Sequence, residues 1–288
     1  MKFIAVLIVV GMQQLLPQLD DLRRFGWLRA LRGTLADRFG TQSWWDGRGG
    51  VFIVLVLPAL VSAFVVAGTG GAAGFLAGAA LLLYSLGPRD LGSQVDRWLT
   101  GVAVADEPAT QAAAVAITGD APDAPAAPAD RIAAAVLVGV NERLCTPLFW
   151  YVVLGAVGPA VAIVYRLSSE LAREPGQPER FAAAARQLAD LLAWAPARLI
   201  ALGYALTGSL VHAFAAWRFS STLGPADNAA VLERAGMGAL QIEDAVQYCA
   251  ADAGNGVVLV NEVRSLVGRT LVAWVTVYFA LTIVALAS

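Results

Sequence analysis

Long apolar runs alternate with polar connections along this chain of 288 residues. An α-helix needs roughly 20 apolar residues to cross the hydrocarbon core of a bilayer, and most of the runs approach that length. The apolar segments lie approximately at residues 3–16, 51–67, 71–86, 147–165, 198–216 and 271–287. The pattern therefore predicts an all-α fold, a polytopic membrane helical bundle that forms one integral-membrane domain over residues 1–288.

Helix-breaking residues interrupt the fourth segment, within CTPLFWYVVLGAVGPAVAIVYR (residues 145–166). Gly155 and the pair Gly158-Pro159 would break or kink a helix and leave backbone carbonyls that other groups must satisfy. One interpretation is a kinked span whose aromatic residues 149–151 form a belt at the membrane interface. The other interpretation is that the segment forms one wall of a binding site.

Amphipathic helices are expected in the polar connections. In PERFAAAARQLADLLAWAPARL (residues 178–199), apolar side chains including Phe181 and Ala185 share one helical stripe. This helix is predicted to end at Pro196, which also suits the first turn of the next segment. The stretch PADNAAVLERAGMGALQIEDAVQYCAADAG (residues 225–254) predicts a pair of helices, whereas the Ala/Pro-rich stretch 118–130 predicts a flexible loop.

Composition supports the membrane prediction. Hydrophobic residues make up 58% of the chain and charged residues 15%, against roughly 45–50% and 25% in a typical soluble protein. Arginines are most frequent in the connection after the first segment, and the positive-inside rule places that connection on the cytoplasmic side of the membrane. A net charge of −2 argues against nucleic acid as a partner and leaves the lipid bilayer as the expected one.

Charged residues beside the apolar segments are candidates for function, because a charge in hydrocarbon costs at least ~2.5–3.5 kcal/mol and usually faces a wet cavity. Arg89, Asp90 and Asp96 follow the third segment, where they form either a polar cluster at a cavity mouth or a helix end with interfacial salt bridges. Arg198 begins the fifth segment, either as a site residue or as an anchor. Arg166 closes the fourth segment and could extend to the interface.

Residues typical of metal centres and of nucleophilic catalysis form no pattern. Cys145 and Cys249 lack a CxxC motif or a Cys/His cluster, so two unpaired thiols are expected. His212, the single histidine, is expected to be a hydrogen-bonded structural residue, and no carboxylate in its segment offers metal-ligand spacing. The sequence thus predicts no cofactor, no metal site and no catalytic residue.

Four short motifs occur in a defined order: TPLFW at residues 146–150, G…YR from Gly158 to Tyr165-Arg166, PARL at 196–199 and AGMGALQIED at 235–244. In this order they resemble the CobD/CbiB membrane family, whose cobalamin-pathway members attach an aminopropanol-type arm to cobyric acid. Within that superfamily, the GPRDL run and the chain length resemble the AmpE branch. AmpE is an inner-membrane protein associated with AmpD, a cytoplasmic anhydro-muropeptide amidase, and with control of β-lactamase induction.

The chain departs from the cobalamin enzymes just before TPLFW. Those enzymes carry a motif of the form EN-[T/S]-x-D-G there, whereas this chain has VGVNERLCTPLF. Glu142 and Arg143 occupy the aspartate and glycine positions, and Val138-Gly139 replaces the Glu-Asn pair. A carboxylate survives without the pair around it, so the resemblance favours a non-catalytic protein over an enzyme.

The resemblance therefore predicts an AmpE-like inner-membrane accessory or sensor protein in β-lactamase induction and cell-wall recycling, with the AmpD pathway or another membrane protein as partner. The alternative is a membrane amide-forming synthase of the cobalamin pathway. A transporter, the third interpretation, would need paired broken helices around a midplane site.

Arginine suits bidentate contact with carboxylate and phosphate groups, so a remnant pocket for a small anionic ligand is expected, with segment 145–166 as one wall. Its predicted residues are Arg89, Asp90, Asp96, Glu142, Arg166 and Arg198. The motif residues expected to shape the surrounding helices are Pro147, Phe149, Trp150, Gly158, Tyr165, Pro196 and Gly238.

Overall fold

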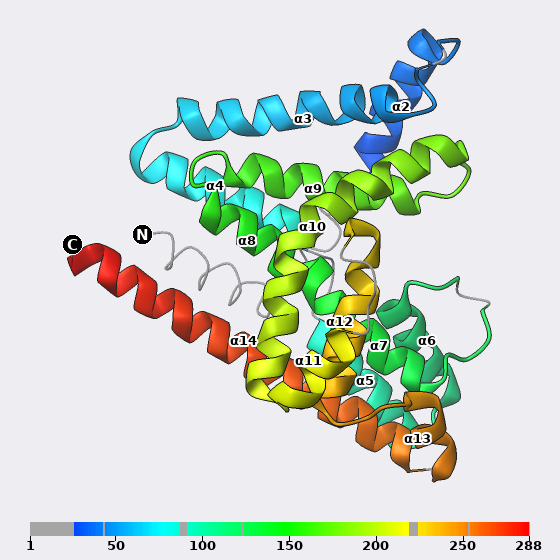
Figure 1. Ribbon diagram of the computed structural model, residues 1–288. Helices are drawn as coiled ribbons and strands as arrows, with labels where there is room; N and C mark the ends of the chain where they lie inside the picture. Colours follow the sequence, from blue (N-terminus) through cyan, green and yellow to red (C-terminus); the bar gives the residue numbers. More distant parts are fainter. Residues whose placement is uncertain are drawn as a thin grey trace. The chain divides into compact units, whose positions relative to one another are not determined.

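The computed structural model describes residues 26–42, 44–86, 91–121, 124–218, 224–252 and 254–287 (Figure 1). Within these ranges all regular secondary structure is helical, so the all-α prediction is confirmed. The predicted first apolar segment, residues 3–16, lies outside them. The helices are α2 (Gly26–Phe39), α3 (Arg48–Gly68), α4 (Gly71–Ser85), α5 (Leu91–Ala103), α6 (Glu107–Thr118), α7 (Ala129–Val140), η2 (Asn141–Cys145), α8 (Thr146–Val153), α9 (Gly158–Arg173), α10 (Glu179–Thr207), α11 (Leu210–Arg218), η3 (Pro225–Asp227), α12 (Asn228–Ala239), α13 (Ala245–Ala251) and α14 (Asn255–Ala287).

Two compact units share these helices. Unit 1 consists of Met1–Pro88 and Arg143–Trp194, and unit 2 consists of Arg89–Glu142 and Ala195–Ser288. The chain therefore passes from unit 2 to unit 1 within η2, and from unit 1 back to unit 2 within α10. The prediction of one integral-membrane domain stays a prediction.

Unit 1 is organised around α9, which packs against α3, α4 and α8 (Figure 1). The predicted amphipathic stripe at the beginning of α10 is confirmed, because Phe181 and Ala185 are both fully buried. The Phe181 ring lies 6.3 Å from that of Trp45, and the two aromatic side chains belong to one hydrophobic cluster. The other buried members of this cluster are Leu28, Val51, Val54, Leu55, Ile163, Leu167, Leu171 and Ala184.

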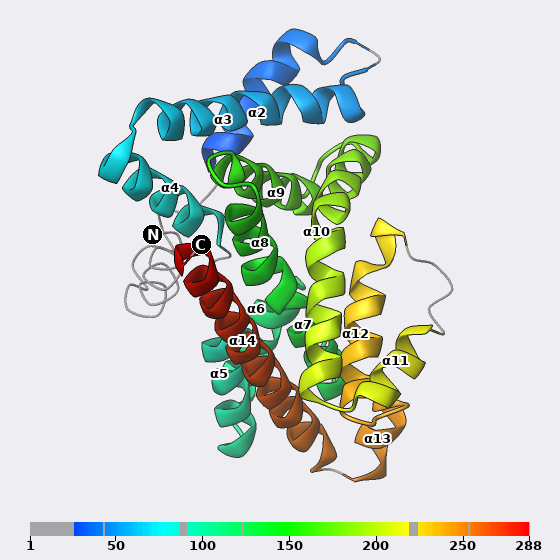
Figure 2. The ribbon, with the colours of Figure 1, turned by 60° about the vertical axis from the view of Figure 1, so that its left-hand side comes forward.

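Unit 2 is built on close contacts between helices, which small residues permit. Helix α7 packs against α6, α12 and α14, and α11 lies along α12 (Figure 2). A Cβ atom added to Gly236 of α12 would lie 2.5 Å from a methyl group of Leu137 in α7. At Gly203 of α10, an added Cβ would lie 2.6 Å from the methyl group of Thr270 in α14. Both glycines are therefore required by the contact and not by a turn.

Three helices of the described chain are long and apolar enough to cross a membrane, judged by length and composition: Arg48–Gly68, Ala129–Val153 and Glu179–Thr207. On the first of these, Phe52, Leu60 and Phe64 are each more than half exposed. Such a row of exposed apolar side chains suits contact with lipid. The structure is thus consistent with the predicted membrane helical bundle.

The fourth apolar segment, residues 147–165, does not form one helix. Helix α8 ends at Val153 and α9 begins at Gly158, so the predicted break is confirmed. Gly155 adopts a φ of 62°, and a Cβ on Gly158 would lie 2.6 Å from the Trp150 carbonyl oxygen. The long helix here is instead Ala129–Val153, which includes the polar stretch before TPLFW.

The prediction that Pro196 ends a helix is wrong, because α10 continues through it to Thr207. A proline lacks the N–H that would pair with the carbonyl four residues earlier, here Leu192. The indole Nε1 of Trp150 donates to that carbonyl oxygen at 2.9 Å. A side chain thus replaces the missing backbone donor, and the helix tolerates the proline.

The fifth apolar segment, residues 198–216, is also divided between two helices. Helix α10 ends at Thr207, and the Ser209 N–H then donates to the Ala239 carbonyl of α12 at 2.8 Å. This bond turns the chain so that α11 runs along α12 (Figure 2). Gly208 permits the turn, since an added Cβ would lie 2.7 Å from the same carbonyl oxygen.

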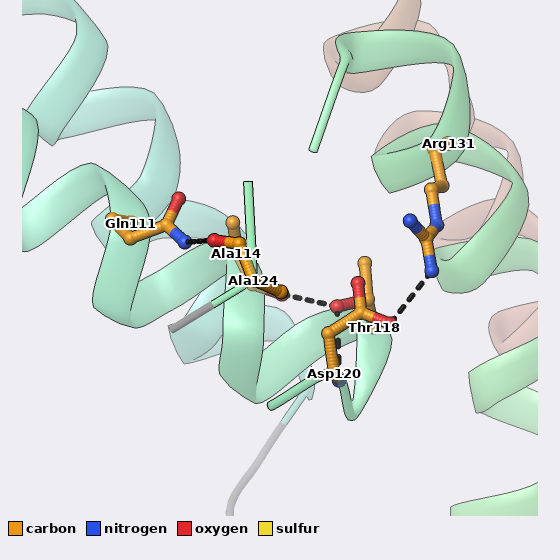
Figure 3. A network of polar contacts seen from close by, with 6 residues as sticks. All are labelled: Gln111, Ala114, Thr118, Asp120, Ala124 and Arg131. Atoms are coloured by element: carbon orange, nitrogen blue, oxygen red, sulfur yellow. Dashed lines mark hydrogen bonds and ion pairs between the residues drawn. The ribbon is translucent and has the colours of Figure 1, made fainter. Parts of the chain in front are cut away.

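Polar contacts hold parts of the Ala/Pro-rich stretch 118–130 (Figure 3). The Gln111 side-chain amide donates to the Ala124 carbonyl at 2.7 Å, and Arg131 forms an ion pair with Asp120 at 2.6 Å. The Asp120 N–H donates to the Thr118 hydroxyl at 3.3 Å. These bonds attach the loop to α6 and α7, while its flexibility stays a prediction.

The bond from Trp150 to Leu192 predicts a dependence between two substitutions. Trp150→Phe should lower the free energy of unfolding by about 1–3 kcal/mol, because the half-buried Leu192 carbonyl loses the indole donor. In a Pro196→Ala background the restored N–H of residue 196 can pair with the Leu192 carbonyl. Trp150→Phe should then lower the free energy of unfolding by less than about 1 kcal/mol. Thermal and chemical unfolding in detergent measures both values.

The control for this pair is Trp44→Phe, since Trp44 is partly exposed and lies far from Pro196 in sequence. Its effect should be the same with and without Pro196→Ala. Equal losses from Trp150→Phe in the two backgrounds would show that the indole does not compensate for the proline.

Candidate functional site

A π-helical turn, η2, interrupts the long apolar helix Ala129–Val153 immediately before TPLFW. Such insertions occur frequently at functional sites. The Asn141 N–H donates to the Val138 carbonyl, three residues back. The Leu137 carbonyl, which a regular helix would pair with that N–H, accepts a 2.9 Å bond from the hydroxyl of Tyr204 on α10. Tyr204 is fully buried, so its hydroxyl stabilises the irregular turn from within unit 2.

Asn141 is the most unusual polar residue of this turn. Its residue surface is 1% exposed, and its Oδ1 atom has no hydrogen-bond partner among the described residues. A buried acceptor without a donor costs about 1–3 kcal/mol, and such groups in native proteins need an explanation. Glu142 follows at once and is partly buried. The turn therefore presents an amide and a carboxylate in succession inside an apolar helix.

Sequence reasoning selected Glu142 and missed Asn141. The signal was present, because an asparagine in the middle of a 25-residue apolar helix needs a hydrogen-bond partner. Residue 141 falls on the variable position of the family motif, whereas the Glu-Asn pair falls on residues 138 and 139. The motif therefore gave no reason to select Asn141.

The predicted pocket residues divide between the two units. Asp96, Glu142 and Arg198 belong to unit 2, and Arg166 belongs to unit 1. Arg89 and Asp90 lie outside the described residues. The gathering of these six side chains around one ligand therefore stays a prediction.

Arg198 connects α10 to the beginning of α12. One guanidinium nitrogen donates to Oδ1 of Asn228, and another donates to the Gly224 carbonyl at 3.1 Å. Asn228 is the first residue of α12 and is buried. The arginine head group is thus engaged by protein oxygens, which supports an anchoring role for this residue.

The other two charged candidates form ion pairs. Asp96 and Arg264 lie 2.8 Å apart, but both side chains are about half exposed, and such surface pairs contribute at most about 1 kcal/mol. Arg166 contacts Glu170 one turn later at 2.5 Å, and its own side chain is only 5% exposed. Arg166 is therefore a buried residue of α9 and does not extend to an interface.

The motif residues have mainly structural surroundings. Pro147 occupies the first turn of α8, and the rings of Phe149 and Trp150 meet edge to face at 5.0 Å. Tyr151 is buried, so the predicted aromatic belt does not include it. The remaining motif residues, Gly158, Tyr165, Pro196 and Gly238, are all buried. For Gly238, an added Cβ would lie 2.8 Å from the His212 carbonyl oxygen, so this glycine lets α11 approach α12.

An open groove of about 690 Å³ in unit 2 is lined in part by the last five residues of the AGMGALQIED motif, 240–244. Glu243, Asp244 and Glu262 line it together with Gln241 and Tyr248. The three carboxylates are exposed, so water continues to solvate them and no enclosed binding site forms. Asp244 also accepts a bond from the Gln247 N–H and thereby caps α13.

Thiol and imidazole groups do not supply a reactive centre in the part of the chain that the structure describes. Cys145 and Cys249 are unpaired, as predicted. Burial and the nearby Asp130 carboxylate raise the pKa of the Cys249 thiol, so it remains protonated at neutral pH. The His212 ring bonds to the Ser209 hydroxyl at 2.7 Å, which agrees with the predicted structural role. The described residues include no group of three or more potential metal ligands.

The helices indicate an all-α membrane protein, and the π-helical turn with its buried Asn141 is the candidate site inside an apolar helix. Residues 14–248 match the family described as CobD/Cbib protein. The chain belongs to this family. No solved structure matches the chain.

Two curated relatives cover part of the chain. The cobalamin biosynthesis protein CobD of Stutzerimonas stutzeri (strain A1501) is 39% identical over 111 residues, which cover 37% of this chain and 36% of the relative. The cobalamin biosynthesis protein CobD of Chromobacterium violaceum is 37% identical over 111 residues, which cover 37% of this chain and 35% of the relative. The chain thus spans little more than a third of the length of each relative.

These comparisons correct the functional prediction. A role in β-lactamase induction and cell-wall recycling is contradicted, because the relatives carry the name of cobalamin biosynthesis. Membership of the AmpE branch is not confirmed. The prediction went wrong because the departure at residues 138–143 was read as a loss of chemistry, whereas the structure places a buried amide and a carboxylate in that turn.

The contact between Arg198 and Asn228 predicts a measurable coupling. Arg198→Ala should lower the free energy of unfolding by about 1–3 kcal/mol, because the side-chain oxygen of the buried Asn228 loses the guanidinium donor. Asn228→Ala in the same background should add little, so a double-mutant cycle should give a coupling energy above about 1 kcal/mol. Unfolding in detergent measures the cycle.

The matched control is the half-exposed pair of Asp96 and Arg264, whose cycle should give at most about 1 kcal/mol and weaken with salt. Additive effects of Arg198→Ala and Asn228→Ala would contradict the anchoring role of Arg198.

Proposed function

We propose that this chain acts in cobalamin biosynthesis as a membrane amide-forming synthase of the bacterial inner membrane. The observation that carries the proposal is the family match over residues 14–248, together with two relatives named for cobalamin biosynthesis. The cobalamin-pathway members of the family attach an aminopropanol-type arm to cobyric acid. The proposed reaction joins an amine of this class to a carboxyl group of cobyric acid.

The chemistry requires three events: activation of the carboxylate, loss of a proton from the amine, and formation of the amide. A nucleoside triphosphate activates the carboxylate, and one oxygen of that carboxylate leaves when the amide forms. The amine must lose a proton before or during its attack on the activated carbonyl carbon. A positioned carboxylate can accept this proton as a general base, which typically contributes a factor of about 10²–10⁴ to the rate.

Glu142 is the residue proposed for this role. It occupies the aspartate position of the family motif, and it lies partly buried in the π-helical turn. The family motif also places an amide group near its carboxylate. In this chain Asn141 supplies an amide two residues later than the lost Asn position, so the Asn141-Glu142 pair takes the place of the missing groups.

Growth complementation tests the proposed function. In a strain that lacks its own CobD-type protein, this chain should restore cobalamin-dependent growth when cobyric acid is supplied. Glu142→Gln should abolish that growth, because the amide cannot accept the proton. Glu107→Gln, an exposed carboxylate at the beginning of α6, should leave growth unchanged.

Two references interpret a negative result. The empty strain must grow on cobinamide, which follows the proposed step, and the Stutzerimonas stutzeri relative must restore growth on cobyric acid. If both conditions hold and this chain is present in the membrane without restoring growth, the proposed function is wrong.

A further inference from the structure

We infer that Asn141 is a substrate-binding residue, whose Oδ1 atom accepts a hydrogen bond from the N–H of the amine that is joined to cobyric acid. This inference rests on the proposed function and deepens it by assigning the amine-binding group. Residue 141 occupies the variable position of the family motif, so the motif does not assign it a role.

The first support is the burial of the acceptor. Asn141 is 1% exposed, yet its Oδ1 atom lacks a donor among the described residues. The free energy lost in this way, about 1–3 kcal/mol, is large beside the 5–15 kcal/mol that stabilises a typical domain. Proteins retain such a group where a ligand or an ordered water completes the hydrogen bond.

The second support is that the surrounding helix cannot supply the donor. Backbone N–H groups inside a helix are already used by carbonyls earlier in the same helix, so an acceptor in the middle of a helix needs a donor from elsewhere. Tyr204 of α10 has a single hydroxyl proton. It donates this proton to the carbonyl of Leu137, which precedes Asn141 by one helical turn. The π-helical turn therefore uses this nearby donor for its own backbone and leaves the asparagine oxygen available.

The third support is the chemistry of the pair. The asparagine oxygen and the adjacent Glu142 carboxylate are both acceptors, and a protonated amine carries three N–H donors. An amide oxygen binds such a group without adding a second negative charge inside an apolar helix, where a charge costs at least ~2.5–3.5 kcal/mol. Two successive acceptors, of which one is neutral, thus suit a primary amine.

The test separates binding from structure. Asn141→Leu replaces the amide with an apolar group of similar size. If the oxygen serves the substrate, the unliganded variant should unfold at the same temperature as the wild type or higher, because an unsatisfied buried acceptor has been removed. The concentration of aminopropanol, or of its phosphate ester, needed for half-maximal amide formation should rise at least 10-fold, since the amine loses one hydrogen bond.

Thr207→Val provides the matched control, because the Thr207 hydroxyl bonds to the Thr270 hydroxyl at 2.8 Å within unit 2. This variant should lower the unfolding temperature, because Thr270 loses its partner, and should leave the amine requirement of the folded protein unchanged. Asn141→Gln should restore part of the amine affinity, since it retains the amide oxygen.

Two results would overturn the inference. One is a fall in the unfolding temperature of Asn141→Leu comparable to that of Thr207→Val, which would make Asn141 a structural residue. The other is an unchanged amine requirement in Asn141→Leu. Failure of the wild type to restore growth on cobyric acid would instead reject the proposed function, and the unfolding temperatures would still decide whether Asn141 is structural.

Discussion

A helix in an apolar environment must satisfy its backbone carbonyl groups from within the protein, because the bilayer core offers no water. At two irregular positions of the described helices, Pro196 in α10 and the π-helical turn η2, an aromatic side chain donates to a carbonyl that the irregularity leaves without its usual partner. In unit 1 the Trp150 indole donates to the Leu192 carbonyl, whose usual partner would be the absent N–H of Pro196. In unit 2 the Tyr204 hydroxyl donates to the Leu137 carbonyl of α7, four residues before the first residue of the π-helical turn. These two bonds permit long apolar helices to contain a proline and a π-helical turn.

The candidate site depends on the second of these bonds. A regular helix through residues 137–146 would carry its side chains at the ordinary spacing, and the π-helical turn inserts one extra residue. This change places the buried amide of Asn141 and the carboxylate of Glu142 in the turn itself. Close helix contacts at Gly203 and Gly236 hold α10 and α12 against their neighbours, so the buried tyrosine has little freedom to move away. The close packing at these glycines thus helps to hold Tyr204 in place, and Tyr204 in turn stabilises the helix just before the polar turn.

Hydropathy predicted the parts of the fold that depend on the period and length of apolar runs. It identified α3, α4 and the stripe of Phe181 and Ala185, and glycine and proline marked the break between α8 and α9. It failed at Pro196 and at residues 138–145, because both depend on a donor from a residue distant in sequence. Trp150 precedes Leu192 by 42 residues, and Tyr204 follows Leu137 by 67. A pattern along one helix contains no information about such partners.

The candidate site was predicted in part. The family motif led to Glu142, but a carboxylate without its usual neighbours was read as evidence against an enzyme. Burial, which only the structure gives, identifies Asn141 as the second polar group. Arg198, in contrast, was a plausible ligand residue by sequence and is held by Asn228 and the Gly224 carbonyl in the structure.

The product of the reaction tests the central claim most directly. Membranes that contain this chain would be incubated with cobyric acid, aminopropanol or its phosphate ester, and a nucleoside triphosphate, and the corrinoids analysed by mass spectrometry. The account predicts a corrinoid heavier than cobyric acid by the mass of the amine less one water, absent when the triphosphate is omitted and absent from membranes without the protein. Unchanged cobyric acid, under conditions in which membranes with a cobalamin-pathway relative form the amide, would contradict it.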